Sequence, residues 1–139
     1  MHIPIEYAKG RGVLDQIAFL SSISNEEKEW LYAHCRYVLV PSRYEGFGLP
    51  VFEAFLARKP ICASDIPVFD EFLVHKKNAM LSPVGDGDAL ADSILALDAD
   101  PTLVRTLVEE GVRTAARFAH ERMVSEYIQL IEKDLMVDL

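Results

Sequence analysis

Two glutamates, Glu45 and Glu53, flank a glycine-containing segment and form the most informative group of side chains in this sequence. Gly46 and Gly48 lie between them, and glycine allows backbone conformations and close approaches that a Cβ atom would block. The segment runs through Pro50 into a predicted helix, whose free amides and dipole favour an anion such as a phosphate. Carboxylates accept hydrogen bonds from paired hydroxyls. The pattern therefore predicts a site for a phosphorylated ligand that carries sugar or ribose hydroxyls.

Other interpretations of the same segment remain open at this point. It is neither G-x-G-x-x-G nor a P-loop, and two glycines around Phe47 are weak evidence alone. Glutamates in such positions also serve as ordinary surface or capping residues. Tyr44 and Phe47 could stack on a base or a sugar, or simply pack within the protein. Arg43 is the nearest cation, although a solvated loop arginine is the commoner role.

Composition excludes several function classes. The chain has 139 residues, half of them apolar, which suits one globular domain over residues 1–139. Its net charge of −8, with the acids spread along the chain, argues against a nucleic-acid partner. The histidines lack the spacing of a metal site or a triad, and Cys35 and Cys62 match no metal pattern. No apolar run approaches the ~20 residues of a membrane span. We expect no metal, no cofactor and a cytoplasmic location, with peripheral membrane association in the complete protein.

The elements that position the glutamates follow from apolar runs and helix-start signals. Apolar runs predict strands at 17–20, 37–40, 60–63 and 79–81. Ser24 and Glu27 predict a capping box at the start of a helix. Further helices are predicted over 50–57 and 67–73, after Asp86 or Asp88, from Asp100-Pro101, and beyond a break near 119–120.

Alternation of strands and helices implies a parallel sheet with right-handed crossovers. The predicted fold is α/β, a three-layer, Rossmann-like parallel sheet of about four strands with C-terminal helices. Ligands bind beyond the carboxyl ends of such strands. The segment 41–50, the pair Ser64-Asp65, and the loop with Ser21 and Ser22 follow three of the predicted strands. A complete doubly wound domain has more strands, so we expect an N-terminally truncated domain.

Residues 41–54, Pro-Ser-Arg-Tyr-Glu-Gly-Phe-Gly-Leu-Pro-Val-Phe-Glu-Ala, resemble the E-x7-E signature of the family 4 (group 1) retaining glycosyltransferases. Three more segments agree in order along the chain. They are 19–27 with its Ser-Asn-Glu-Glu helix start, 63–71 with Ala-Ser-Asp-Ile-Pro and a later Glu, and 85–91 with Gly-Asp and Ala-Leu-Ala. The resemblance implies the C-terminal, donor-binding domain of a two-domain GT-B enzyme.

The resemblance also implies residue roles. Glu45 would contact the donor sugar hydroxyls as the catalytic residue, and Glu53 would bind the ribose of the nucleotide. The segment from Gly46 would hold the sugar and the diphosphate through the amides of Phe47, Gly48 and Leu49. Ser21 and Ser22 would lie near the base. Such enzymes transfer a hexosyl group from a nucleotide diphosphate sugar, such as a UDP- or GDP-hexose, with retention and generally without a metal.

Two departures from the family pattern bear on these expectations. Arg58 stands where the family usually has a glycine in the left-handed conformation that ends the helix. An arginine in that conformation should cost roughly 1 kcal/mol of stability. The acceptor-binding domain and earlier strand–helix units are absent from these residues, so we expect the chain alone to be inactive. The last predicted helix carries an apolar stripe that lacks its partner domain, and we expect self-association through it: Met123, Tyr127, Leu130 and Ile131. The alternatives are a non-catalytic nucleotide-sugar-binding module, one subunit of a split transferase, or a phosphorylase or epimerase relative.

Overall fold

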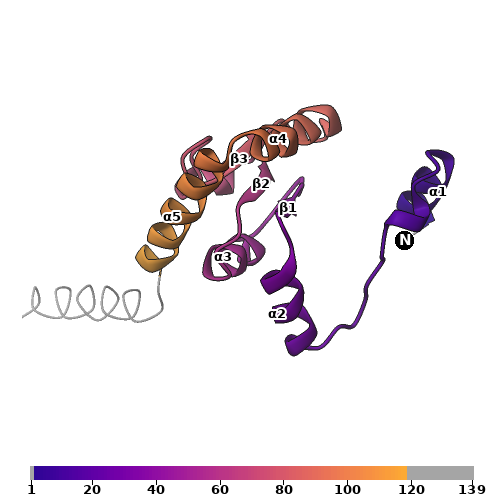
Figure 1. Ribbon diagram of the computed structural model, residues 1–139, viewed down its shortest axis with the longest axis horizontal. Helices are drawn as coiled ribbons and strands as arrows, with labels where there is room; N and C mark the ends of the chain where they lie inside the picture. Colours follow the sequence, from indigo (N-terminus) through magenta and orange to yellow (C-terminus); the bar gives the residue numbers. More distant parts are fainter. Residues whose placement is uncertain (1, 119–139) are drawn as a thin grey trace, which may run out of the picture. The chain divides into compact units, whose positions relative to one another are not determined.

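Three short strands form a parallel sheet in the order β1 (Val38–Val40), β2 (Ile61–Ser64) and β3 (Met80–Ser82) (Figure 1). Leu39 pairs with Cys62 in the register of β1 and β2, and Ala63 pairs with Leu81 in the register of β2 and β3. All four residues of β2 are buried. Burial on both faces is typical of the central strand of a parallel sheet, and it explains the continuous apolar run in the sequence.

The computed structural model describes residues 2–118, which divide into two units after Trp30. The first unit holds α1 (His2–Gly10), η1 (Leu14–Gln16) and the beginning of α2 (Asn25–His34). Helix α1 was not predicted from the sequence. The second unit contains the sheet, α3 (Leu49–Leu56), η2 (Pro67–Glu71), α4 (Gly87–Ala99) and α5 (Pro101–Arg117). The predicted last helix lies outside the described residues.

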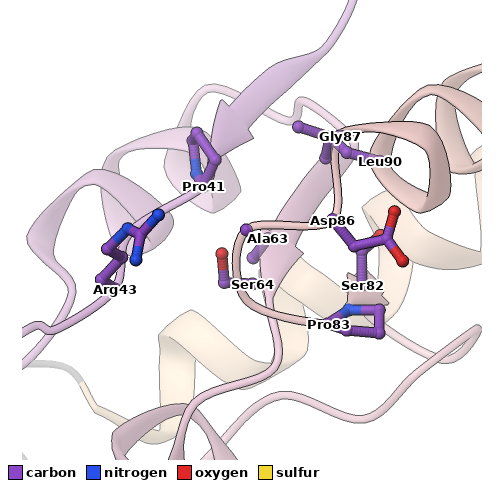
Figure 2. Close-up of a pocket in the computed structure, with 10 residues that line it drawn as sticks. Pro41, Arg43, Ala63, Ser64, Ser82, Pro83, Asp86, Gly87 and Leu90 are labelled. Carbon is purple, nitrogen blue, oxygen red and sulfur yellow. The ribbon is translucent and has the colours of Figure 1, made fainter.

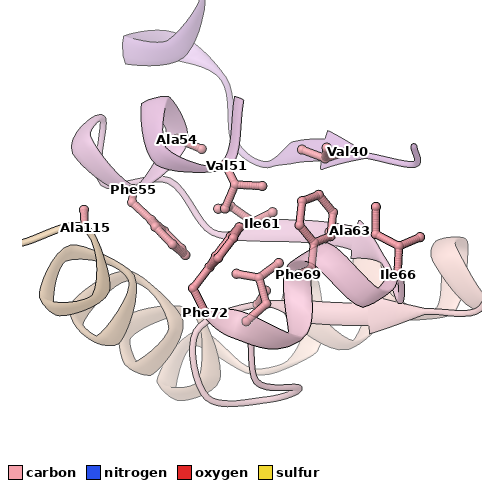
Figure 3. Close-up of a cluster of buried hydrophobic side chains, with 12 residues drawn as sticks. Val40, Val51, Ala54, Phe55, Ile61, Ala63, Ile66, Phe69, Phe72 and Ala115 are labelled. Atoms are coloured by element: carbon pink, nitrogen blue, oxygen red, sulfur yellow. The ribbon is translucent and has the colours of Figure 1, made fainter. Parts of the chain in front are cut away.

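The two faces of the sheet carry separate cores, as a three-layer α/β fold requires. Ile61 and Ala63 of β2 join a cluster with α3 and η2, whereas Cys62 joins a cluster with α4 on the opposite face. Figure 3 shows the first cluster, in which the phenylalanine rings from α3 and η2 pack against β2. Helix α5 contributes Leu107 to the second cluster and Ala115 to the first. The predicted α/β fold is confirmed.

Helix starts were the best-predicted local features. Ser24 and Glu27 form the expected capping box, with Ser24 N donating to Glu27 Oε2 at 2.8 Å and Glu27 N donating to Ser24 Oγ at 3.2 Å. Of the two aspartates proposed for α4, Asp86 is the cap, since its carboxylate accepts from Ala89 N at 2.9 Å. Asp100 caps α5 in the same way. The segment predicted as a helix over 67–73 is the 3-10 helix η2.

The strand predicted at 17–20 is wrong, and the described sheet has three strands instead of about four. Ile17 has extended dihedral angles, but the segment forms no ladder with another described strand. Leu20 is 57% exposed. An apolar run becomes a strand only when a neighbour supplies hydrogen-bond partners, and the sequence pattern does not show whether one is present.

Arg58 adopts the left-handed conformation, with φ +57°, that the missing glycine would have taken. Lys59 N donates to Ala54 O and Arg58 N donates to Phe55 O, the two hydrogen bonds of a Schellman motif. The α3 C-terminus therefore keeps the geometry usual for glycine, with an arginine in the strained position.

Candidate functional site

The loop between β1 and α3 positions Glu45. Ser42 Oγ donates a hydrogen bond of 2.7 Å to Glu45 Oε1, and the glutamate is half-buried. The structure gives Oε2 of Glu45 no partner among the described residues. This carboxylate is thus held in place from its own loop while one oxygen is available to a ligand hydroxyl.

Gly48 begins helix α3 in a conformation that favours glycine. Its φ is +91° and its ψ is 43°, and a Cβ added here would lie 2.6 Å from Cε1 of Phe69. No side chain caps the helix start, and Pro50 at its second position has no amide hydrogen to donate. The helix start therefore presents backbone amides and the positive end of the dipole without a side-chain acceptor of its own.

Glu53 lies just beyond the first turn of α3 and contacts Tyr32 of α2. Tyr32 Oη donates to Glu53 Oε2 at 3.0 Å, and it lies 3.5 Å from the carbonyl oxygen of Pro50. Burial, and secondly the hydrogen bond to Glu53, raise the pKa of Tyr32 above its ordinary value. The hydroxyl therefore stays protonated at neutral pH and can keep donating to the carboxylate. Nothing in the sequence pattern indicated this tyrosine.

The side chain of Phe47 packs against other phenylalanine rings and is 44% exposed. Its ring stacks on Phe52 at 4.9 Å between centroids with an interplanar angle of 3°, and Phe72 and Phe118 complete the group. Of the two roles left open for Phe47, packing is the one observed. Tyr44 is 87% exposed, so its ring remains available.

Ser21 and Ser22 belong to the first unit. Ser22 has φ +55°, a left-handed conformation uncommon for serine. Their placement near a nucleotide base stays a prediction.

A hollow of about 220 Å³ lies at the carboxyl ends of the three strands (Figure 2). Its lining comes from the last residues of β2 and β3, the segments after β1 and β3, and the start of α4: Pro41, Arg43, Ala63, Ser64, Ser82, Pro83, Gly85, Asp86, Gly87 and Leu90. Neither Glu45 nor Glu53 lines it. Ser64 lies at the sheet edge predicted for it, and Arg43 is the cation noted beside the glutamate segment. The residues on the β3 side were not predicted, although a position just after a predicted strand could have indicated them.

An apolar hollow of about 470 Å³ lies between α3 and α5, lined by Phe47, Leu49, Phe52, Leu56, Val112, Ala115, Ala116 and Phe118. The apolar stripe of the last predicted helix, through which self-association was expected, lies outside the described residues, so self-association stays a prediction.

Across residues 2–118, no three histidine, cysteine, aspartate or glutamate side chains are grouped as a metal ion would need. None of the described helices is both long enough and apolar enough to cross a membrane.

Comparison with known proteins gives the same family as the E-x7-E segment. The family model described as "Glycosyl transferases group 1" matches residues 4–114. The lipopolysaccharide core biosynthesis mannosyltransferase LpcC of Rhizobium leguminosarum bv. viciae is 36% identical over 115 residues, which is 82% of this chain and 32% of that relative. The chain therefore spans about a third of the length of this curated relative.

Two solved structures share the fold. The C-terminal domain of the group 1 glycosyl transferase LpcC from Francisella tularensis is 27% identical, with a TM-score of 0.66 over 80% of this chain and 57% of that one. Anabaena Alr3699/HepE, solved in complex with UDP-glucose, is 25% identical, with a TM-score of 0.76 over 95% of this chain and 35% of that one.

Proposed function

Since this chain belongs to the group 1 glycosyltransferase family, we propose that residues 45–53 hold the donor of a retaining hexosyl transfer from a nucleotide diphosphate sugar. The observation that carries the proposal is the start of α3, where a left-handed glycine stands in place of a capping side chain. A helix start of this kind favours a diphosphate. The structure of the relative HepE with UDP-glucose supports a nucleotide-sugar donor.

Glu45 and Glu53 are proposed to bind different parts of this donor. Glu45, with one oxygen held by Ser42, would accept hydrogen bonds from hydroxyls of the hexose. Glu53 would accept from the ribose hydroxyls, with Tyr32 fixing the orientation of its carboxylate. We propose hydroxyl binding for both and no proton transfer. This assignment separates them from the acid and nucleophile carboxylates of glycosidases.

The amides of Phe47, Gly48 and Leu49 are proposed to stabilise the leaving diphosphate. When the bond between the anomeric carbon and the diphosphate oxygen breaks, negative charge grows on that oxygen. Fixed amide donors at a helix start stabilise such charge without having to reorient during the reaction. No metal is needed in this scheme, and none is proposed. The acceptor is proposed to be a growing glycan, in keeping with the lipopolysaccharide relative, handled in the cytoplasm or at a membrane surface.

Nucleotide titration tests the donor site. UDP, GDP and ADP would each be titrated into the 139-residue chain by calorimetry, beside the variant Glu53→Ala. One nucleotide is expected to bind, and Glu53→Ala should weaken it about tenfold or more, because hydrogen bonds to a charged acceptor are worth roughly 1.5–3 kcal/mol. Glu109→Ala, an exposed glutamate on α5, is the matched control. Equal affinity in the Glu53 and Glu109 variants would remove Glu53 from the site.

The chain alone is proposed to bind a donor without transferring the sugar. Relatives such as LpcC are about three times as long as the part that this chain matches. A mass-spectrometric assay with a nucleotide hexose and a glycan acceptor should detect no sugar transfer. Turnover by this chain would contradict the proposal and leave the donor site itself untouched.

A further inference from the structure

We propose that the hollow at the strand ends is a second site, which binds a single phosphate group through Arg43 and Ser64. It is distinct from the segment that contains Glu45 and Glu53, because neither glutamate lines it. Its volume of about 220 Å³ is below the roughly 300–1,000 Å³ of pockets that hold drug-sized ligands. The hollow therefore suits a phosphate or a small phosphate ester better than a whole nucleotide sugar.

Ser64 is the observation that points to a ligand. It is one of five buried polar side chains in the described part of the chain and is only 4% exposed. The other four, Asn78, Ser82, Ser93 and Thr114, all have side-chain hydrogen bonds. Within residues 2–118, the structure gives the Ser64 hydroxyl no partner.

The Ser64 hydroxyl opens into the hollow. Among the described residues, no fully buried side-chain oxygen or nitrogen lacks a partner. The unpartnered Oγ must therefore touch solvent, and the hollow is the space that Ser64 lines. A hydroxyl held at the end of a rigid, fully buried strand can donate to a ligand oxygen with little loss of freedom.

Arg43 supplies the charge. Its guanidinium reaches from the loop after β1 to the loop after β3, where Nη2 would lie 3.6 Å from a Cβ placed on Gly85. The structure gives Arg43 no ion pair within the described residues. An unpaired guanidinium beside a buried hydroxyl matches the geometry of a phosphate, which arginine can bind with two parallel hydrogen bonds.

Asp86 is the acidic residue among those that line the hollow. Its Oδ1 accepts the amide of Ala89 at 2.9 Å, so the carboxylate is directed to the start of α4. Figure 2 shows the Asp86 carboxylate pointing away from the side of the hollow where Arg43 and Ser64 lie. Its charge should still weaken anion binding. Removal of Arg43 should therefore lower the affinity for phosphate, and removal of Asp86 should raise it.

Inorganic phosphate is the probe, titrated into the full chain by calorimetry at low salt, with a hexose 6-phosphate and UDP in parallel. Arg43→Gln should weaken phosphate binding about tenfold, and Ser64→Ala about threefold to tenfold. Asp86→Ser, which keeps a good capping residue, should tighten it. Arg105→Gln, an exposed arginine on α5, should leave it unchanged. Chemical-shift changes of the Gly85 and Gly87 amides on addition of phosphate, measured by nuclear magnetic resonance, would locate the ion independently of the variants.

The titrations distinguish free phosphate from a phosphate ester as the ligand, and the hollow from the proposed donor site. A stronger response to hexose phosphate than to phosphate supports an ester as the natural ligand, and equal responses support the free ion. UDP binding that depends on Glu53 and not on Arg43 belongs to the donor site and leaves this proposal standing. Absence of phosphate binding, or equal binding by wild type and a folded Arg43→Gln variant, overturns it.

Discussion

Helices α3 and α4 both begin at the carboxyl edge of the sheet, but their first turns are built differently. Helix α4 starts at Asp86, whose carboxylate accepts the Ala89 amide and complements the helix dipole. Helix α3 starts at Gly48, which offers no side-chain acceptor. The first amides of α4 thus have an aspartate as acceptor, whereas those of α3 have no side-chain acceptor and are available to an external anion. The two helix starts therefore differ in whether a side chain already accepts a hydrogen bond from their first amides.

The substitution Gly48→Ala, at the start of α3, should have the largest effect on the free energy of unfolding. Alanine at φ +91° is strained, and its Cβ would lie 2.6 Å from the Phe69 ring. Strain and overpacking together should lower the free energy of unfolding by about 2–4 kcal/mol, measured by urea denaturation. Gly46→Ala is the control, because a Cβ there meets nothing within 4 Å. Similar losses in both variants would show that the position of Gly48 is not special.

Removal of the α4 cap by Asp86→Ala should have an intermediate effect on the free energy of unfolding. Loss of the hydrogen bond to Ala89 N should reduce the free energy of unfolding by about 1 kcal/mol. Asp92→Ala, an exposed aspartate within α4, should change it by less than about 0.5 kcal/mol. If the two variants are equally stable, α4 does not depend on its cap and the contrast with α3 loses its basis.

The C-terminal end of α3 offers a stabilising change, Arg58→Gly. Glycine removes the strain at φ +57° and should raise the free energy of unfolding by about 0.5–1 kcal/mol. The same replacement at Arg105, inside α5, should lower it by about 1 kcal/mol. Destabilisation by Arg58→Gly would mean that the arginine side chain contributes more than its conformation costs.

Tyr32→Phe should have an effect of the same small size at neutral pH, a loss of about 0.5–1 kcal/mol, from the lost hydrogen bond to Glu53. The raised pKa adds a pH dependence. Tyr32 contributes its full stability below its ordinary pKa of 10.0, and that contribution is lost as the pH rises above this value, because only the unfolded chain ionises readily. Wild type should lose more stability than Tyr32→Phe above pH 10, as followed by thermal unfolding. Tyr44→Phe, at an exposed tyrosine, should behave as wild type does.

Local signals in the sequence predicted most of the fold and part of the site. Ser24 with Glu27 and the aspartates before α4 and α5 predicted helix starts correctly, because capping depends on residues within one turn. The run at 17–20 failed because strand formation depends on a partner distant in sequence. The contact of Tyr32 with Glu53 and the reach of Arg43 to Gly85 were missed for the same reason.

Helix α3 is seated by two contacts between a glycine and a phenylalanine ring. At its start, Gly48 lies against Phe69 of η2, and near its end Phe55 lies against Gly111 of α5, where a Cβ would come within 2.3 Å of the ring. A helix fixed at both ends has little freedom to slide along its axis. Residues 45–53 should therefore meet a ligand already in their bound geometry, and binding there should show a small conformational entropy penalty.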